Sequence, residues 1–347
     1  MPPTAEAADK AWLERPRKHA VLAVPTTDKK PMPIHLEPGP DNVHWGYFDA
    51  RLPPRLTIDS GERVTISTVS GGPELMPAAP LKVPPALPAI HQKVPRQLGP
   101  HICTGPIAIR GAKAGQVLQV DIEAIDVFYD WGYNSVRPLA GALPDDFADN
   151  RHIHIVLDRA RKSWRLPWGQ EVPLAPFFGV MGTAPPPAWG MISTAPPRRN
   201  GGNLDNKELV AGTTLYLPIF VDGALFSVGD GHGVQGDGEV CLTAIETGLI
   251  GTFELILRDD MKLDLPYAET PTHAITMAFD PDLDDCVVVA LRQMIDLIAR
   301  KSGITREDAY SLCSLAADLH ITQVVNGSKG VHVMLEKKYL QPVRKSA

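Results

Sequence analysis

Four side chains able to carry chemistry lie close together in a glycine-rich stretch, residues 224–240. They are Asp230, His232, Asp237 and Glu239. The glycines between them allow positive φ and close approach of a ligand. In an extended chain, residues two apart point to one face, so we expect Asp230 to project with His232, and Asp237 with Glu239. An imidazole with carboxylates is a plausible ligand set for zinc or another divalent cation.

This stretch has other interpretations. Gly-Asp-Gly is also common in tight turns, where the aspartate only caps the turn. The spacing Gly231-x-Gly233-x-x-Gly236 formally matches a dinucleotide-binding fingerprint. That fingerprint requires a helix directly after it, and we predict a strand at residues 240–245. We reject dinucleotide binding and keep two hypotheses open, a catalytic or metal-binding segment and a plain turn.

Other polar positions are weaker candidates. Residues 200–205 read Asn-Gly-Gly-Asn-Leu-Asp, which could form a backbone nest, although in isolation a plain turn is the better interpretation. His152 and His154 are two apart in a predicted strand, and they look like its ordinary polar face. His44 and His101 each lie at a loop–strand boundary, where a lone histidine is more often structural than a ligand.

No motif for a protein nucleophile is present in the sequence. There is no Gly-x-Ser-x-Gly elbow. Ser70-Gly71-Gly72 lacks the serine-rich context and paired lysine of amidase-signature enzymes. None of the four cysteines has the glutamate and lysine setting of a nitrilase. If the protein is a hydrolase, activation of water by a metal is the better mechanism.

Short strands are the elements that must position these residues. The chain has 34 prolines and 29 glycines among 347 residues, which disfavours long helices. We predict a hairpin over residues 56–69 and further strands at residues 107–125, 152–157, 214–220, 224–228, 240–245 and 252–257. The fold class is therefore mainly β, with a β-sandwich or barrel-like core. Proline-rich residues 74–100 and 184–197 are expected to be long irregular loops over that core.

The C-terminal part has helical signals. Apolar spacing predicts a helix over residues 284–301, which Gly303 ends. A capping box from Thr305 to Asp308 begins a second helix that continues to residue 319. Two strands follow, at residues 321–325 and 331–335. We expect an N-terminal extension at 1–30, a β-rich catalytic core at 31–270 and an α+β segment at 271–340, the last two forming one structural unit.

Composition limits the classes of partner. A net charge of −6 gives no basic surface for nucleic acid, so we expect no nucleic-acid partner. The four cysteines form no CxxC pair and are too few for a disulfide framework. The N-terminus lacks the apolar region of a signal peptide, and no apolar run is long enough to span a bilayer. We expect a cytoplasmic protein without a membrane partner.

A series of motifs connects the candidate residues to a known family. They are Thr104-Gly-Pro-Ile107, residues 176–185 (Pro-Phe-Phe-Gly-Val-Met-Gly-Thr-Ala-Pro), residues 193–205 ending in Gly-Gly-Asn-Leu-Asp, Leu217-Pro218, residues 229–239 and residues 314–326. With these motifs in this order, from about His44 to Leu335, the chain resembles the acetamidase/formamidase family.

The resemblance implies hydrolysis of small amides such as formamide or acetamide, or of cyclic γ-lactams. It also implies a largely β fold and a homo-oligomer. The family's conserved polar positions fall on Asn203, Asp205, Asp230, His232, Asp237 and Glu239.

From these positions we expect a divalent metal, with Zn²⁺ as first candidate. His232, Asp230 and Asp205 are its expected ligands. Glu239 or Asp237 is the expected general base, and Asn203 and His44 are expected to bind the substrate. The alternative is a non-catalytic β-sandwich module that binds a sugar or peptide, although only 6% of residues are aromatic.

Overall fold

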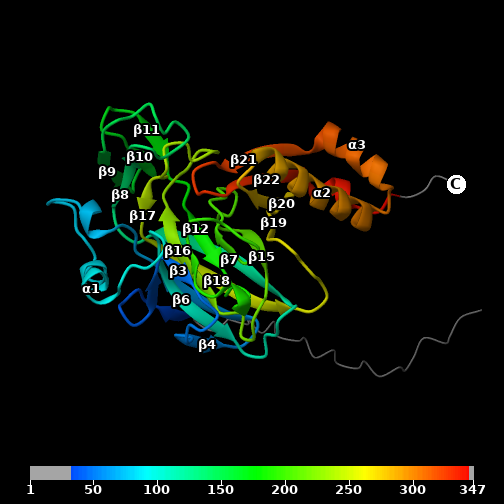
Figure 1. Ribbon diagram of the computed structural model, residues 1–347, viewed down its shortest axis with the longest axis horizontal. Helices are drawn as coiled ribbons and strands as arrows, with labels where there is room; N and C mark the ends of the chain where they lie inside the picture. Colours follow the sequence, from blue (N-terminus) through cyan, green and yellow to red (C-terminus); the bar gives the residue numbers. More distant parts are fainter. Residues whose placement is uncertain (1–32, 344–347) are drawn as a thin grey trace, which may run out of the picture. The chain divides into compact units, whose positions relative to one another are not determined.

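The computed structural model describes residues 33–343, which form two large β-sheets and one two-stranded pair (Figure 1). The expected extension at residues 1–30 lies outside this range. The predicted mainly β fold is confirmed. Because neither large sheet closes on itself, the core is a sandwich and not a barrel.

The first sheet has nine strands and is antiparallel except for its first pair. The expected boundary near residue 270 falls inside this sheet, which joins the predicted core to the C-terminal segment. The strand order is β1 (Ile34–Leu36), β5 (Glu62–Ser67), β18 (Leu249–Arg258), β7 (Val117–Val127), β15 (Thr213–Pro218), β19 (Tyr267–Glu269), β20 (His273–Asp280), β22 (Lys329–Glu336) and β21 (Asp318–Gln323).

The second sheet has eleven strands, and β16 (Phe226–His232) lies inside it, buried at all seven positions. Its main path is β11 (Glu171–Pro173), β10 (Ser163–Arg165), β9 (Arg151–Asp158), β8 (Trp131–Val136), β17 (Glu246–Thr247), β16, β12 (Phe177–Gly182) and β14 (Gly201–Asn203). Strand β6 (Ile102–Ile109) pairs with β16, and also with β2 (Val43–Trp45) and β4 (Leu56–Ile58). A separate pair joins β3 (Tyr47–Phe48) to β13 (Ile192–Ser193).

Three phenylalanines connect the two sheets through the main hydrophobic core. The rings of Phe178 and Phe226 lie 5.5 and 6.1 Å from the ring of Phe253, which belongs to the other sheet. All three side chains are fully buried. Each contributes about 1.5–3 kcal/mol by leaving water, so the sandwich gives β16 a rigid support.

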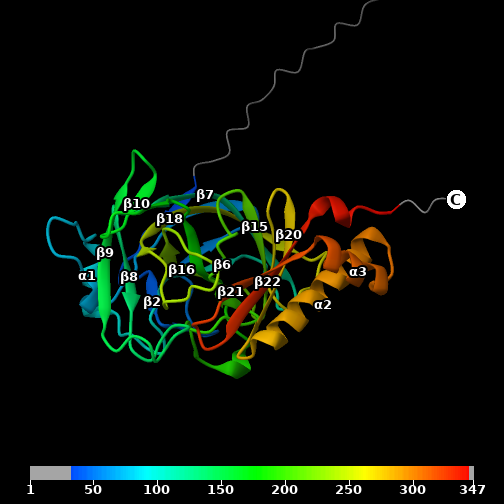
Figure 2. The ribbon, with the colours of Figure 1, turned by 90° about the horizontal axis from the view of Figure 1, so that it is seen from above.

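Two helices cover the C-terminal end of the nine-stranded sheet, beside β20 and β22 (Figure 2). Helix α2 (Leu283–Ser302) begins at Asp282, whose carboxylate accepts two backbone N–H bonds, and ends at left-handed Gly303. Helix α3 (Arg306–Ala316) begins at Thr305, whose hydroxyl accepts a bond from the Asp308 N–H. Both predicted helices and their caps are confirmed, although α3 ends before residue 319.

Two strand predictions are wrong. Residues 56–69 do not form a hairpin, because β4 pairs with β6 while β5 pairs with β1 and β18 in the other sheet. Residues 240–245 form an irregular loop. There the amide of Asn134 donates to the carbonyls of Thr243 and Ala244, which a strand would use in its ladder. The rejection of dinucleotide binding stands, because no helix follows Gly236.

The two proline-rich segments contain more regular secondary structure than expected. Residues 74–100 contain helix α1 (Ala86–Lys93) and most of a 3₁₀ turn, η1 (Pro73–Leu75). Residues 184–197 contain η2 (Pro187–Trp189) and β13. A last 3₁₀ turn, η3 (Lys337–Leu340), follows β22. Among residues 33–343, no helix is both long and apolar enough to cross a membrane.

Candidate active site

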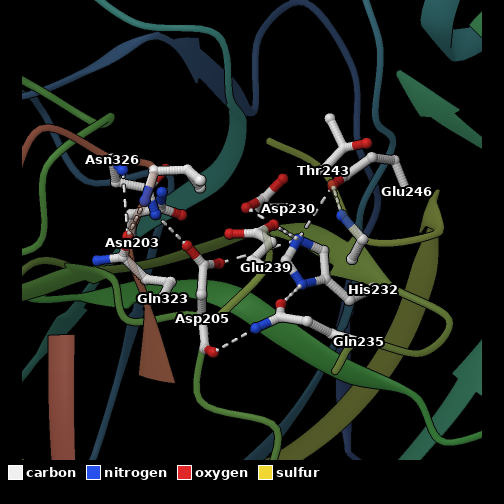
Figure 3. A network of polar contacts seen from close by, with 12 residues as sticks. Asn203, Asp205, Asp230, His232, Gln235, Glu239, Thr243, Glu246, Gln323 and Asn326 are labelled. Atoms are coloured by element: carbon white, nitrogen blue, oxygen red, sulfur yellow. Dashed lines mark hydrogen bonds and ion pairs between the residues drawn. The ribbon is translucent and has the colours of Figure 1, made fainter. Parts of the chain in front are cut away.

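A cluster of buried ionisable side chains surrounds the end of β16 (Figure 3). Asp230 and His232 belong to β16, and Asp205 follows β14. Glu239 lies in the glycine-rich loop, and Glu246 begins β17. None of the five is more than 6% exposed, so four carboxyl groups share one water-poor space.

The imidazole of His232 is at the centre of the cluster (Figure 3). Its Nε2 lies 3.3 Å from an oxygen of Asp230 and 3.4 Å from one of Glu246. The nearest oxygens of Asp205 and Glu239 are 3.9 and 4.0 Å from the same nitrogen. These distances are long for hydrogen bonds. They place His232 in two groups of possible cation ligands, one with Asp205 and Glu239 and one with Asp230 and Glu246.

Unusual backbone conformations aim three of the acids inward. Asp205, Asp230 and Glu239 have φ of 45°, 56° and 46°. Aspartate tolerates the left-handed region, whereas glutamate adopts it rarely. Such conformations are costly and cluster at functional sites, so their coincidence on three acids of one cluster indicates function.

Gln235 fixes the orientation of the His232 ring. Its Nε2 donates to the carbonyl of Asp205 at 2.8 Å, so its Oε1 faces Nδ1 of His232 at 2.9 Å. Nδ1 must then carry a proton, so in the neutral ring the lone pair of Nε2 is directed at the carboxylates. A hydrogen bond on the second nitrogen is the arrangement that orients metal-binding histidines. Asn326 also donates to Oδ2 of Asp205.

Three buried atoms of the cluster have no hydrogen-bond partner within the described part of the chain. They are Oδ1 of Asp205, Nε2 of His232 and Oε2 of Glu239. Buried polar atoms are almost always paired, and an unpaired one costs about 1–3 kcal/mol. A bound cation would pair all three atoms.

Burial and mutual repulsion perturb the ionisation of the acids. Burial raises the pKa of Asp205 to about 8 and that of Glu246 to about 7. Burial, with the nearby charge of Asp205, also raises the pKa of Glu239 well above its usual range. Burial would likewise raise the pKa of Asp230, but the charges of His101 and His232 hold it below its usual range.

The pKa of His232 is raised well above its usual value. Burial alone would lower it, but the charges of Glu246 and Asp230 dominate. The protein by itself therefore retains extra protons in this cluster. A bound cation would displace them, since ligands must be deprotonated to coordinate a metal.

Gly179 in β12 leaves a hollow inside the cluster. A Cβ at this position would lie 2.5 Å from Oδ1 of Asp205, 2.6 Å from Oδ2 of Asp230 and 2.9 Å from Cε1 of His232. Real Cβ atoms essentially never approach other atoms this closely. Only glycine fits here, and the space it leaves lies among three of the polar side chains.

A cavity of about 420 Å³ opens onto the cluster. Its floor includes Asp230, Glu239 and Glu246. Asn203 also lines it, with its Nδ2 bonded to the carbonyl of Ala195 and its Oδ1 buried without a partner in residues 33–343. The site can therefore admit a small molecule and offer it an unused acceptor.

Most of the predicted site residues lie in or beside the His232 cluster, but Asp237 does not. Its carboxylate bonds Nζ of Lys207 at 2.8 Å and Nδ1 of His320 at 3.1 Å. Gly238, at φ 93°, and Glu239 break the extended geometry that would have placed Asp237 and Glu239 on one face. The expected common face is wrong, because the loop separates the two side chains.

His44 also lies apart from the cluster. Its Nε2 is 2.9 Å from the hydroxyl of Ser227, and its ring packs against Tyr47 and Phe48. Among the described residues, those that line the cavity do not include His44. Its substrate-binding role stays a prediction without geometric support.

Several members of the site were not predicted from the sequence. His101 was interpreted as structural, yet its Nε2 lies 3.6 Å from Asp230. The pairing of Cys103 with Gly229 brings it there, and a local pattern does not reveal such a pairing. Glu246 could have been noticed, because it is a lone acid at the end of an apolar run.

Comparison with known proteins identifies the family. The model of the Acetamidase/Formamidase family matches residues 94–193 and 188–273, which together span just over half of the chain. The chain belongs to the acetamidase/formamidase family. The predicted resemblance is confirmed, and the protein is an amidase that acts on carbon–nitrogen bonds other than peptide bonds. The alternative of a non-catalytic binding module is wrong.

Individual relatives agree with this assignment. A formamidase of Methylophilus methylotrophus is 26% identical over 299 residues, covering 65% of this chain and 73% of the relative. The crystal structure of an acetamidase from Bacillus halodurans has a TM-score of 0.77 and 29% identity, covering 88% of this chain and 98% of its own. A γ-lactamase from Delftia acidovorans has a TM-score of 0.57 at 21% identity over 89% of this chain and 92% of its own, and so shares the fold.

Proposed function

We propose that this amidase hydrolyses small linear amides of the formamide or acetamide type, or cyclic γ-lactams, with a divalent cation at the His232 cluster. The observation that carries the proposal is the convergence of unpaired, buried atoms of Asp205, His232 and Glu239 beside a cavity. The names of the formamidase and acetamidase relatives support the choice of substrate.

The cluster fits a divalent cation. His232 with Asp205 and Glu239, and His232 with Asp230 and Glu246, form two groups whose ligand atoms lie within 4.8 Å of one another. A set of one imidazole and several carboxylates suits zinc among other divalent metals, and the hollow at Gly179 leaves room among them. We propose His232, Asp230 and Asp205 as ligands, a set that takes one carboxylate from each of the two groups. When bound, such a cation would act as a Lewis acid that eases deprotonation of water.

Glu239 is our candidate for proton transfer. Burial raises its pKa above the usual range of a glutamate, and burial is one way in which carboxyl groups are adapted for proton transfer. It would accept a proton from the attacking water and deliver it to the leaving nitrogen, giving a carboxylic acid and ammonia from a linear primary amide, or an amino acid from a lactam. Asp237 suits this role less well, because its carboxylate is held by Lys207 and His320.

Asn203 is our candidate for positioning the substrate. Its Oδ1 has no hydrogen-bond partner among the described residues, so it can accept a hydrogen bond from the N–H of an amide. Such an acceptor would distinguish an amide from an ester of the same shape, since the ester lacks the donor.

A substrate panel tests the reaction. Purified enzyme is incubated with formamide, acetamide, propionamide and 2-pyrrolidinone. Released ammonia is measured for the linear amides, and the ring-opened amino acid for the lactam. We expect turnover of at least one substrate, and the absence of turnover with all four would refute the proposal.

We further propose a cytoplasmic homo-oligomer. The four cysteines are free thiols, as expected in a reducing compartment. Large apolar side chains are exposed on α3 and on the edge strand β21, including Leu315 at 84% and Ile321 at 44%. Light scattering after size exclusion tests the assembly. Leu315→Lys is expected to weaken it, and a monomeric wild-type protein would contradict it.

A further inference from the structure

We propose that the preferred substrates are amides that also carry a carboxylate group, which Arg137 and Arg96 bind at the rim of the active-site cavity. This inference rests on the proposed amide hydrolysis and names the class of amide. The cavity volume, the free guanidinium groups and the distribution of charge around the cavity carry it.

The cavity is much larger than the simplest amides require. It encloses about 420 Å³, whereas a water molecule takes about 30 Å³ of liquid volume. Formamide and acetamide have only three and four heavy atoms, so either would leave most of this space to water. The volume is within the usual range for larger ligands, about 300–1,000 Å³.

Arg137 is the half-buried cation of the cavity wall. It follows the last residue of β8 and lines the cavity with Arg96. Its guanidinium forms no hydrogen bond or ion pair with another residue of 33–343. Arginine offers five donors in a planar fork that matches a carboxylate, so an unengaged arginine beside a ligand cavity is a ready anion site.

Arg96 is available in the same way. Its Nε donates to the carbonyl of Gly99 at 3.0 Å, which orients the group. No residue in the described part of the chain bonds its terminal nitrogens, so these can bind a ligand. Glu74 is the acid on this side of the cavity, and its carboxylate folds back against Gly72. Two arginines therefore outnumber the one acid at the rim.

The two ends of the cavity carry opposite charge. The buried part of the lining, the floor, has Asp230, Glu239 and Glu246, which would repel a second carboxylate. The more exposed part, the rim, has the arginines. Tyr133 of β8 pairs with Glu246 on the floor. Arg137 lies four residues further along, so its Cα is about 13 Å from that of Tyr133 at the rise of a strand. Its long side chain shortens the span that a ligand must bridge. A substrate with an amide at one end and a carboxylate at the other would enter in one orientation only.

Matched pairs of substrates test this inference. Succinamate and glutaramate each carry one amide and one carboxylate, and succinamide and glutaramide replace the carboxylate by a second amide. We expect wild-type kcat/KM to be at least tenfold higher for the acids than for the diamides. In Arg137→Gln this ratio should fall about 10- to 100-fold, the range for losing a charge-assisted hydrogen bond.

Further variants separate recognition from structural support. Arg137→Lys should restore part of the ratio, because it keeps the charge without the fork. Arg96→Gln should lower the ratio as well. Arg165→Gln, an exposed arginine on β10, is the matched control and should leave the ratio unchanged.

The contrary outcomes are distinct. Equal wild-type kcat/KM for the acids and the diamides would overturn carboxylate recognition while leaving amide hydrolysis intact. If Arg137→Gln slowed both classes equally, the arginine would only stabilise the acids of the floor, and the inference would also be overturned. Absence of turnover with the simple amides alone would refute only the proposed choice of simple substrates. Absence of turnover with both sets would refute amide hydrolysis, and this inference with it.

Discussion

Gly179→Ala is the most specific perturbation that the structure suggests, because it adds one methyl group to the centre of the cluster. The new Cβ would lie 2.5 Å from Oδ1 of Asp205 and 2.6 Å from Oδ2 of Asp230. Gly179 does not have positive φ, so alanine is compatible with its backbone. The effect is therefore one of space alone.

The size of the effect follows from these distances. Ordinary contact begins at about 3.4 Å, so the two carboxylates must move away by about 0.8–0.9 Å. A misplacement near 1 Å in a catalytic site costs about 10²-fold in rate. Overpacking of a buried site costs about 1–3 kcal/mol of stability. We expect the protein still to fold. Its kcat should fall by about 10²-fold, and its bound metal by at least half.

Three measurements on the same preparation decide the outcome. They are ammonia release, metal content by mass spectrometry and the melting temperature. Gly39→Ala, in the turn before β2 with open space around its Cβ, is the matched control and should behave as wild type. A folded Gly179→Ala enzyme with full activity and full metal content would refute the placement of the site in this hollow.

Three further variants test other parts of the account. Glu239→Gln should keep the metal and the melting temperature but lower kcat about 10²–10⁴-fold, because glutamine cannot accept the proton; unchanged turnover would remove Glu239 from this role. Asp237→Asn breaks the pairing with the partly exposed Lys207, so it should cost less than about 1 kcal/mol and keep the activity of each folded molecule; a loss like that of Glu239→Gln would instead identify Asp237 as the base. Burial lowers the pKa of His44 to about 4, below its unfolded value of about 6.5. Its contribution to stability is therefore present above pH 6.5 and is lost as the pH falls towards 4. Between pH 7 and 5 the wild type should therefore lose more unfolding free energy than His44→Gln, by about 2 kcal/mol. Urea titration measures this difference. An equal loss in both proteins would contradict the assignment of this pH dependence to buried His44.

The two C-terminal helices could be predicted from the sequence, because short-range features define them. The spacing of α2, the stop at Gly303 and the cap at Thr305 are short-range features, and all three occur in the structure. The hairpin over residues 56–69 failed because the partners of β4 and β5 come from distant segments. Turn chemistry shows where the chain reverses but does not specify the partner of each strand.

The same distinction applies to the site. Asp230, His232 and Glu239 were found because they share one glycine-rich stretch. His101 was missed because it reaches the cluster through the pairing of β6 with β16. Gly179 carries no chemical signal in the sequence, since its contribution is the absence of a side chain. Asp237 looked equivalent to Glu239 until the backbone at Gly238 separated them.

The dependence of activity on bound metal tests the central claim most directly. The enzyme is treated with a chelator, dialysed free of it and titrated with Zn²⁺, and ammonia release from acetamide or formamide is measured against bound metal. We predict that activity disappears with the metal and returns in proportion to its rebinding, reaching a maximum near one ion per chain. Full activity in a preparation shown to contain no metal would contradict the claim that the His232 cluster works through a cation.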